Sequence, residues 1–455
     1  MAEVPEIIEL QKIVEPFLQG ATLESYKSQY LTKPGDNYGS IMLSINAKIK
    51  QTNGDIQDLP LIAKLPPLTN DLYWQIFQPE RTCITENAVY KYLSPELKKL
   101  QLEAGVLPTD IFDGFPRYYG SRISLDADAS KVDRDAVLVQ ENVTSRGYRP
   151  GNRHKSYDLE HTVLILHYLA QFHALPLALR LKKPKVYDQF VRPYFKKFNM
   201  NDNMEADLKN VLNEETLADI KEIFKDNDRD IQRVQELQFL FDEFQSADNV
   251  PDGLWTSIGH MDAWINNLMV KYGELALNYF RIAYNILNLF SDDDDEVPTK
   301  LKIVDFQIAQ YESVVHDIIF LLLSSVDTPV LEENYYNFLR IYYDAFIKSL
   351  RSVHADTSEY SYEAYVPNKM FSSIMYVVHK PYLICRFLNE VKRVAHIQIP
   401  HALFMTKVVL AENDTLPDDY KDVDLTVLTK NRGVGKIMDK ISDILRLSKK
   451  FGIFY

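Results

Sequence analysis

Two acidic segments in the second half of the chain carry the residue types that phosphoryl transfer requires. The first contains His260, Asp262 and Asn267 in the spacing His-x-Asp-x-x-x-x-Asn, and the second contains Asp305 followed by Phe306. Moving a phosphate from ATP to a hydroxyl needs one carboxylate that accepts or orients the hydroxyl proton. It also needs a second carboxylate and an amide that hold Mg²⁺ on the phosphates. The two segments together supply all three groups.

Each of these groups also has a structural interpretation. Asp262 and Asn267 could satisfy the amides of a turn, but their apolar flanks indicate a loop held between buried strands, where polar groups need partners or a role. We expect His260 to be a packed, hydrogen-bonded histidine rather than a base. Asp305 ends an apolar strand pattern, where a carboxylate is costly unless a cation meets it. A helix cap or a salt bridge is the alternative to magnesium ligation there.

Lys64 and Glu86 form a second candidate pair. Lys64 lies in the short apolar strand 61–65, where a lysine could also extend to solvent or protect a sheet edge. Glu86 shares an apolar helix face with the residues at i+3, i+4 and i+7, which are Val89, Tyr90 and Leu93. A buried carboxylate needs a cation, and Lys64 is the nearest candidate upstream. A lysine anchored in this way would point at nucleotide phosphates.

Glycines at 35 and 39 precede the first strand of the sheet. Gly35 and Gly39 would let the backbone approach phosphates, and an ordinary turn is an equally good interpretation. The sequence has no Gly-x-x-x-x-Gly-Lys-Ser/Thr string, which removes the P-loop class. Three histidines at six-residue steps, at 161, 167 and 173, lack metal-ligand spacing, and we interpret them as structural.

The elements that must position these residues divide the chain in two. Residues 1–139 mix helix and strand, with strands predicted at 40–49, 61–65 and 136–139 and a hairpin turn at 51–55. A connection follows at 140–142, and the rest is mainly helical, with segments at 158–181, 205–245, 334–353 and 431–447. We predict an α+β protein with a small sheet-bearing lobe over 1–139 and a larger helical lobe over 140–455.

Composition excludes several classes of protein. The chain has 455 residues, of which 46% are hydrophobic and 25% charged, as in an ordinary globular protein. A net charge of −13 argues against nucleic-acid binding. Two cysteines give no disulfide framework, and no signal peptide is recognisable. We also expect that no uncharged apolar run approaches the length of a membrane span. We expect a cytoplasmic monomer that binds neither nucleic acid nor membranes.

Taken together, the motifs resemble the ecdysteroid kinase-like family of insects, a branch of the choline kinase and aminoglycoside phosphotransferase group. The order of the acidic segments is that of kinase-like folds. The resemblance extends from about residue 35 to 325 and includes segments 35–38, 62–67, 137–142, 158–161, 169–174, 262–267 and 304–307, together with Glu86, Tyr90 and Asp317. It implies a bilobal protein-kinase-like fold.

The resemblance also implies roles for the candidate residues. Asp262 would be the catalytic base, Asn267 and Asp305 would hold Mg²⁺, and Asp317 would brace the catalytic loop. The nucleotide-binding residues would be Lys64, paired with Glu86, the loop glycines Gly35 and Gly39, and the adenine-binding backbone of Gln140, Glu141 and Asn142. The cofactors would be ATP and Mg²⁺, and the acceptor a hydroxyl of a small molecule, an ecdysteroid-like steroid or a xenobiotic.

Two departures from the family pattern favour an alternative, a catalytically impaired relative that binds ligand or nucleotide without phosphoryl transfer. Met261 stands where the family usually has glycine, and an apolar insertion over 274–291 interrupts a short hairpin. We interpret the insertion as a translated, unspliced intron, because Gly273-Glu274-Leu275 can be encoded with a GTGAGT donor and Phe290-Ser291-Asp292 with a TTTTCAG acceptor. Sequencing of cDNA tests this, and a segment retained in every mature transcript would contradict it.

Other enzyme classes fit the sequence less well. Trp264 stands two positions after Asp262, where protein kinases usually carry lysine, and no Ala-Pro-Glu signature follows Asp305. A His/Asp metal phosphohydrolase would need further clustered His-Asp pairs. The sequence leaves open whether an aromatic set lines an acceptor site or forms core; the set is Phe172, Tyr335, Tyr342, Tyr343 and Tyr376.

Overall fold

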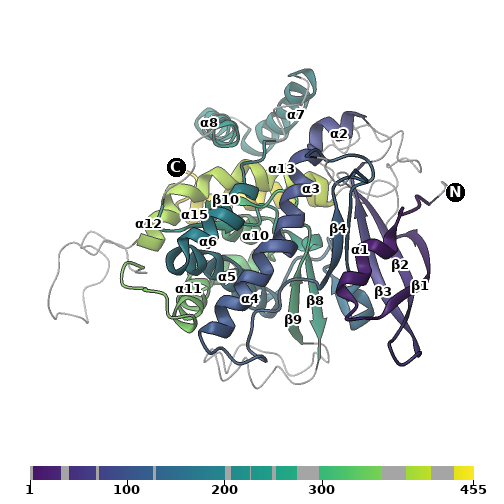
Figure 1. The fold of residues 1–455 in the computed structure, drawn as a ribbon. Coiled ribbons are helices and arrows are strands. Elements are labelled where there is room, and N and C mark those ends of the chain that lie inside the picture. Colours follow the sequence, from purple (N-terminus) through teal and green to yellow (C-terminus); the bar gives the residue numbers. More distant parts are fainter. Residues whose placement is uncertain are drawn as a thin grey trace.

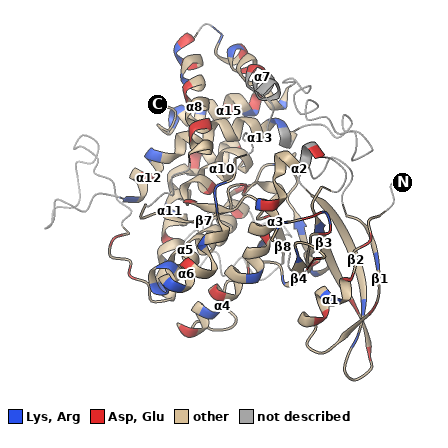
Figure 2. Ribbon diagram, turned by 45° about the horizontal axis from the view of Figure 1, so that its top comes forward, with Lys and Arg blue, Asp and Glu red and all other residues tan. Residues whose placement is uncertain are grey.

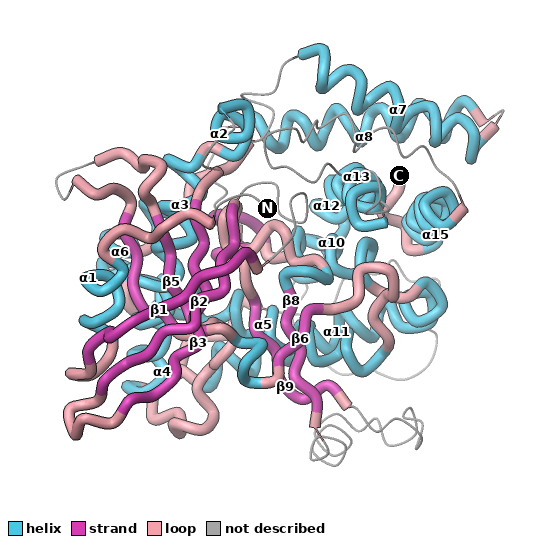
Figure 3. The backbone as a smooth tube through the Cα atoms, turned by 90° about the vertical axis from the view of Figure 1, so that its right-hand side faces the viewer, coloured by secondary structure: helices cyan, strands magenta, loops and turns pink. Residues whose placement is uncertain are grey.

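The computed structural model describes residues 4–31, 40–67, 71–126, 130–199, 206–225, 227–247, 253–273, 297–360, 386–410 and 435–455. Figure 1 shows a strand-rich part of the molecule beside a larger helical part. Figure 3 shows the same division from the side. The predicted α+β, bilobal kinase-like class, with an antiparallel sheet in the smaller lobe, is confirmed.

The smaller lobe is built on an antiparallel sheet in the order β1-β2-β3-β5-β4. Its strands are β1 (Thr22–Tyr30), β2 (Ile41–Lys50), β3 (Ile56–Leu65), β4 (Tyr118–Arg122) and β5 (Val137–Glu141). Buried residues of the central strands, Leu43 and Ala63 among them, form an apolar core with helix α1 (Leu10–Val14), which leads into the 3₁₀ turn η1 (Glu15–Phe17). Because side chains alternate along a strand, Lys64 leaves β3 on the face opposite to Ala63.

The connection from β3 to β4 is helical. It consists of α2 (Asp71–Phe77), α3 (Pro79–Ala88), a π-helical turn η2 (Val89–Leu93) and α4 (Ser94–Glu103), the last three following one another directly. Pro79 begins α3 at a position whose N–H would have no partner inside the helix. The apolar face predicted from Val89, Tyr90 and Leu93 is buried in the main core. This packing turns Glu86 inward.

The larger lobe surrounds α5 (Leu159–Lys182), which is buried along most of its length and begins at Asp158, whose side chain accepts the His161 N–H. In Figures 1 and 3, α7 and α8 lie side by side at one end of the molecule. Figure 2 shows acidic and basic residues interspersed on outer helices such as α4 and α8. The remaining helices are α6 (Pro184–Phe190), α7 (Ala206–Phe224), α8 (Asp228–Ser246), α10 (Val315–Ser325), α11 (Thr328–Ser352), α12 (Arg386–Val394), α13 (Gln398–Leu410) and α15 (Lys436–Lys450), with 3₁₀ turns η3 (Val143–Arg146), η4 (Arg192–Tyr194) and η7 (Ala395–Ile397).

Two small antiparallel sheets carry the acidic segments. One pairs β7 (Thr256–Gly259) with β10 (Gln310–Ser313), and the other has the order β6 (Tyr148–Pro150), β8 (Leu268–Tyr272), β9 (Pro298–Ile303). The β8–β9 hairpin closes where the Gly273 N–H donates to Val297 O at 3.1 Å. The predicted insertion, 274–291, lies outside the described residues, between these two closing positions.

Three local expectations were wrong. Strand β1 was not predicted, because as an edge strand with no fully buried side chain it lacks an apolar alternation. Strand β5 extends through Gln140 and Glu141, which were predicted to begin the connection, because both still pair with neighbouring strands. The expectation that no uncharged apolar run approaches the length of a membrane span was also wrong, because helix α5 contains the uncharged stretch 161–179. By length and composition α5 could cross a membrane, but 83% of an apolar 18-residue stretch of this helix is buried inside the fold.

Candidate active site

The loop between β7 and β8 holds the first acidic segment, and it ends in a 3₁₀ turn, η6 (Ile265–Asn267). His260 is fully buried; its Nε2 lies 2.9 Å from Val304 O, and its Nδ1 accepts the Asp262 N–H at 3.2 Å. Burial lowers the pKa of His260, which favours a neutral ring that donates from Nε2 and accepts at Nδ1. The prediction of a packed, hydrogen-bonded histidine is confirmed.

Asp317 in α10 binds the backbone of the loop between β7 and β8. Its carboxylate accepts the N–H groups of His260 and Met261, each at 2.6 Å, and lies 2.9 Å from Nε2 of His173. The other ring nitrogen of His173 contacts the Tyr342 hydroxyl at 2.8 Å. Burial opposes ionisation of Asp317, but its hydrogen bonds and its electrostatic interaction with His173 and His260 outweigh burial and lower its pKa. The predicted brace and the structural role of His173 are both confirmed.

Met261 adopts a left-handed backbone conformation, with φ of 67°. This conformation favours glycine, and a side chain there costs about 1–2 kcal/mol. The Met261 side chain is nevertheless buried, and its sulfur packs over Gly259, where a Cβ would lie 3.2 Å from Sδ. Gly259 thus makes room for the Met261 side chain. Asp317 still accepts the loop N–H groups although methionine stands where the family usually has glycine.

We expect Met261→Ala to lower the free energy of unfolding more than Met261→Gly, by about 1 kcal/mol. Alanine retains the unfavourable backbone conformation and loses the buried side chain, whereas glycine loses only the side chain. Urea unfolding of the two variants measures the difference. Met269 in β8 provides the control, because glycine should be worse than alanine in a strand. An alanine variant at 261 more stable than the glycine variant would contradict the strain argument.

Asp262 and Asn267 are held against each other across the loop. The Asn267 side-chain nitrogen donates to Asp262 O at 2.9 Å and to Asp262 Oδ2 at 3.0 Å. Because the amide is planar, its oxygen points away from Asp262. Desolvation first, and then the charge of Asp305, raise the pKa of Asp262 well above its usual value. Its carboxylate is therefore basic for an aspartate.

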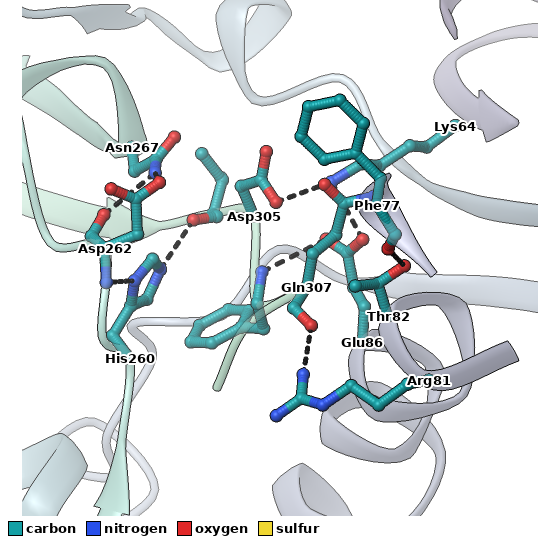
Figure 4. A network of polar contacts seen from close by, with 12 residues as sticks. Lys64, Phe77, Arg81, Thr82, Glu86, His260, Asp262, Asn267, Asp305 and Gln307 are labelled. Carbon is teal, nitrogen blue, oxygen red and sulfur yellow. Dashed lines mark hydrogen bonds and ion pairs between the residues drawn. The ribbon is translucent and has the colours of Figure 1, made fainter. Parts of the chain in front are cut away.

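Lys64 lies between two carboxylates. Its Nζ is 2.8 Å from Glu86 Oε2 and 2.7 Å from Asp305 Oδ1, and the Lys64 and Glu86 side chains are 6% and 3% exposed. Burial alone would lower the pKa of Lys64, but Asp305 and Glu86 outweigh it and raise the pKa, so the lysine stays charged. The predicted Lys64–Glu86 pair is confirmed. Figure 4 shows that this pair, Asp305, Asn267 and Asp262 belong to one polar network.

The turn that follows β9 presents Asp305 to this network. Asp305 has a φ of 64°, a conformation that aspartate tolerates better than most residues, and its side chain is 31% exposed. The next residue, Phe306, donates its N–H to Glu86 Oε1 at 3.2 Å. Its ring is fully buried against Tyr90 and His260, with centroid distances of 5.9 and 4.9 Å. Phe306 thus ties Asp305 to both lobes.

The oxygen atoms of Asp305 and Asn267 are of the kind that Mg²⁺ binds. Magnesium usually takes one or two carboxylates and completes its shell with water and substrate phosphates. Asp305 is partly exposed, and Asn267 turns its amide oxygen away from Asp262. In this network three carboxylates share one lysine, and a bound divalent cation would favour their ionised forms. Within the described ranges, no group of three or more His, Cys, Asp or Glu forms a separate metal site.

The other predicted site residues include two glycines of the nucleotide loop and the adenine-binding segment 140–142. Gly35 and Gly39 fall outside the described residues. Gln140 and Glu141 are buried in β5, and the Asn142 side chain caps η3 by accepting the Thr144 N–H at 3.1 Å. The N–H groups of Glu141 and Asn142 donate to Arg117 O and Pro60 O. An adenine contact in this segment would therefore use other backbone groups.

The aromatic set left open by the sequence is mainly core. Phe172, Tyr335 and Tyr342 are buried in the main core, Tyr343 packs against it, and Tyr376 lies outside the described residues. Sequence reasoning missed Arg81, which donates to two backbone carbonyls in the turn after Asp305 and to Lys196 O. No sequence signal identifies such a residue, because its acceptors are backbone atoms.

The two-lobed fold, with a Lys–Glu pair in one lobe and an Asp/Asn loop beside a second aspartate in the other, defines a protein of the kinase-like class. A sequence profile of the ecdysteroid kinase-like family matches residues 34–278 and 284–355. The chain therefore belongs to the ecdysteroid kinase-like family, which at family level comprises kinase-like small-molecule phosphotransferases. No curated protein matches the chain. The profile match is interrupted over 279–283, inside the predicted insertion.

Proposed function

We propose that this protein transfers a phosphoryl group from ATP to a hydroxyl of a small molecule, an ecdysteroid-like steroid or a xenobiotic, with Mg²⁺ as cofactor. One observation carries the proposal: Lys64, Asp262, Asn267 and Asp305, from distant parts of the chain, share one polar network. Small-molecule acceptors are typical of the family.

Each residue of the network has a distinct task in this proposal. Lys64, kept charged and fixed by Glu86, holds the nucleotide phosphates. Asp262 accepts or orients the proton of the acceptor hydroxyl, and Asn267 fixes the direction of its carboxylate. Asp305 and the amide oxygen of Asn267 would hold Mg²⁺, which neutralises charge on the phosphates. Burial of the network keeps water from competing with the acceptor.

The family supports a small-molecule acceptor, and the class of that acceptor is open to direct test. We propose an acceptor of steroid or xenobiotic type, and a protein that acts as a cytoplasmic monomer. Turnover of ATP with a panel of hydroxylated steroids and xenobiotics, compared between wild type and Asp262→Asn, tests the transfer. Product formation by wild type alone supports the proposal. Nucleotide binding without transfer to any acceptor would instead favour the impaired, ligand-binding alternative.

We expect ATP with Mg²⁺ to stabilise the protein against unfolding by about 2.7 kcal/mol at a concentration 100 times its Kd. Asp305→Asn should lose most of the shift, because a neutral amide replaces the carboxylate that meets the cation. Thermal unfolding with ATP, with Mg²⁺ and with both measures the effect. Asp344→Asn, on the exposed face of α11, is the control that should keep the full shift. An equal shift in the Asp305 variant would contradict the assignment.

A further inference from the structure

A segment of the larger lobe, Tyr194–Asn199, receives hydrogen bonds from one face of helix α3. Gln78, the N-cap residue of α3, donates to Asn199 O at 2.9 Å, and Thr85 donates to Tyr194 O at 2.8 Å. Arg81 lies between them in sequence and donates to Lys196 O. Positions 78, 81 and 85 follow the spacing of a single helix face. We call Tyr194–Asn199 the strap.

The strap is fixed by β10 as well. The Tyr311 N–H donates to Phe195 O at 3.1 Å, and the Phe198 N–H donates to the side-chain oxygen of Gln310 at 2.9 Å. Gln310 is 4% exposed, so this contact is made away from water. Backbone groups of the strap therefore alternate between α3 and β10. Helix α3 is held, through the strap, to the strand that follows the Asp305 turn.

Arg81 also binds the Asp305 turn directly. Its guanidinium donates to Gln307 O at 2.5 Å (Figure 4). It also donates to Ala309 O at 2.9 Å. In the part of the chain that the structure describes, no carboxylate forms an ion pair with Arg81, and its acceptors are backbone carbonyls. Only a planar group with several fixed donors can reach three carbonyls on two segments, and lysine cannot reproduce this geometry.

We propose that Arg81 is a positioning residue which, together with the strap, fixes helix α3 and turn 305–309 in register. Glu86 lies on α3 and Asp305 lies in the turn, so this arrangement assembles both partners of Lys64 before any ligand binds. Helix α3 is then a permanent part of the site and not a movable switch. The inference rests on the proposed function only in treating the Lys64 network as the phosphate site.

Hydrogen exchange of the full-length protein without ligand tests the positioning. Arg81→Ala should raise exchange rates in peptides covering 79–88 and 304–309 by about tenfold or more, because local opening no longer breaks the arginine contacts. Thr85→Val keeps the shape of the side chain, removes one strap bond and should raise exchange in 79–88 by a smaller factor. Arg122→Ala is the matched control, since Arg122 also donates to backbone carbonyls, those of Asp135 and Ile8, within the smaller lobe. It should leave both peptides unchanged.

Kinetics of the same variants give a second measure. Arg81→Ala should lower kcat about tenfold, as misplaced catalytic groups do, and added guanidinium should restore part of the loss in this variant only. Arg81→Lys, which keeps the charge, should not recover wild-type activity.

The outcomes separate the two proposals. Unchanged local exchange in Arg81→Ala and Thr85→Val, or an equal rise in Arg122→Ala, overturns the positioning role. If Arg81→Ala does not fold, the exchange rates of peptide 79–88 in Thr85→Val and in Arg122→Ala are compared instead. A rise in Thr85→Val alone supports the positioning role, and any other result overturns it. If the variants show the expected exchange pattern but the wild-type protein transfers no phosphate, the positioning role is supported and the proposed function is overturned.

Discussion

Replacing Asp262 with asparagine is expected to lower kcat about 10²–10⁴-fold, the contribution that a positioned base typically makes. The amide retains the shape of the side chain and its contact with Asn267 but cannot accept the hydroxyl proton. Steady-state kinetics with an accepted acceptor measure the loss, and the KM for ATP should change little. Asp344→Asn, an exposed carboxylate paired with Arg340, should remain fully active.

The same substitution should stabilise the fold at neutral pH. Desolvation and the neighbouring Asp305 raise the pKa of Asp262 in the folded protein. The group therefore weakens folding increasingly as the pH rises from its unfolded pKa of about 3.9 through the folded value. Asparagine removes that charge. A variant that is less active and also less stable than wild type would indicate a structural role for Asp262 and count against its role as a base.

Removing the brace should have the largest effect on stability. We expect Asp317→Ala to lower the free energy of unfolding by about 3–5 kcal/mol, because it leaves buried donors without their charged acceptor. These donors are the N–H groups of His260 and Met261 and the ring of His173. Urea unfolding at neutral pH measures the loss, and Asp344→Ala should cost less than about 0.5 kcal/mol.

The pH dependence of wild-type stability provides a check on the brace. The folded pKa of Asp317 is lowered, so its contribution is fully present above the unfolded pKa of about 3.9 and disappears as the pH falls through the lower, folded value. The difference between wild type and Asp317→Ala should therefore persist at pH 6 and shrink only in strong acid, below about pH 4. A difference already lost at pH 6 would contradict this account.

The Lys64–Glu86 pair was predictable from the sequence, because a buried charge needs a partner of opposite charge. A glutamate on an apolar helix face needs a cation, which is why Glu86 pointed to Lys64. Asp317 was predicted only through resemblance, since a buried aspartate that accepts backbone N–H groups leaves no spacing signal. Met261 was recognised as a departure, but its left-handed backbone and its contact with Gly259 required the fold. The same is true of Arg81, whose acceptors are carbonyls that every residue carries.

The fold was predicted best where a pattern had one dominant cause. Strand β2 alternates because one of its faces is buried, and the predicted strand 61–65 is apolar throughout because that half of β3 is buried on both faces. Helix α5 is apolar all round because it forms the centre of a lobe. Strand β1 has no buried side chain, so it exists through pairing with β2 and not through its own pattern. The end of β5 was misplaced because Gln140 and Glu141 are polar residues that are nevertheless buried in a strand.

The closing contact of the β8–β9 hairpin has a consequence for the gene that encodes this chain. Pairing continues up to Tyr272 opposite Pro298, and one more bond joins Gly273 to Val297. An in-frame splicing change confined to the predicted insertion, 274–291, leaves residues 292–296 to connect the two strands and need not change their register. Transcripts with and without segment 274–291 would then encode two isoforms with the same candidate catalytic residues in the same places.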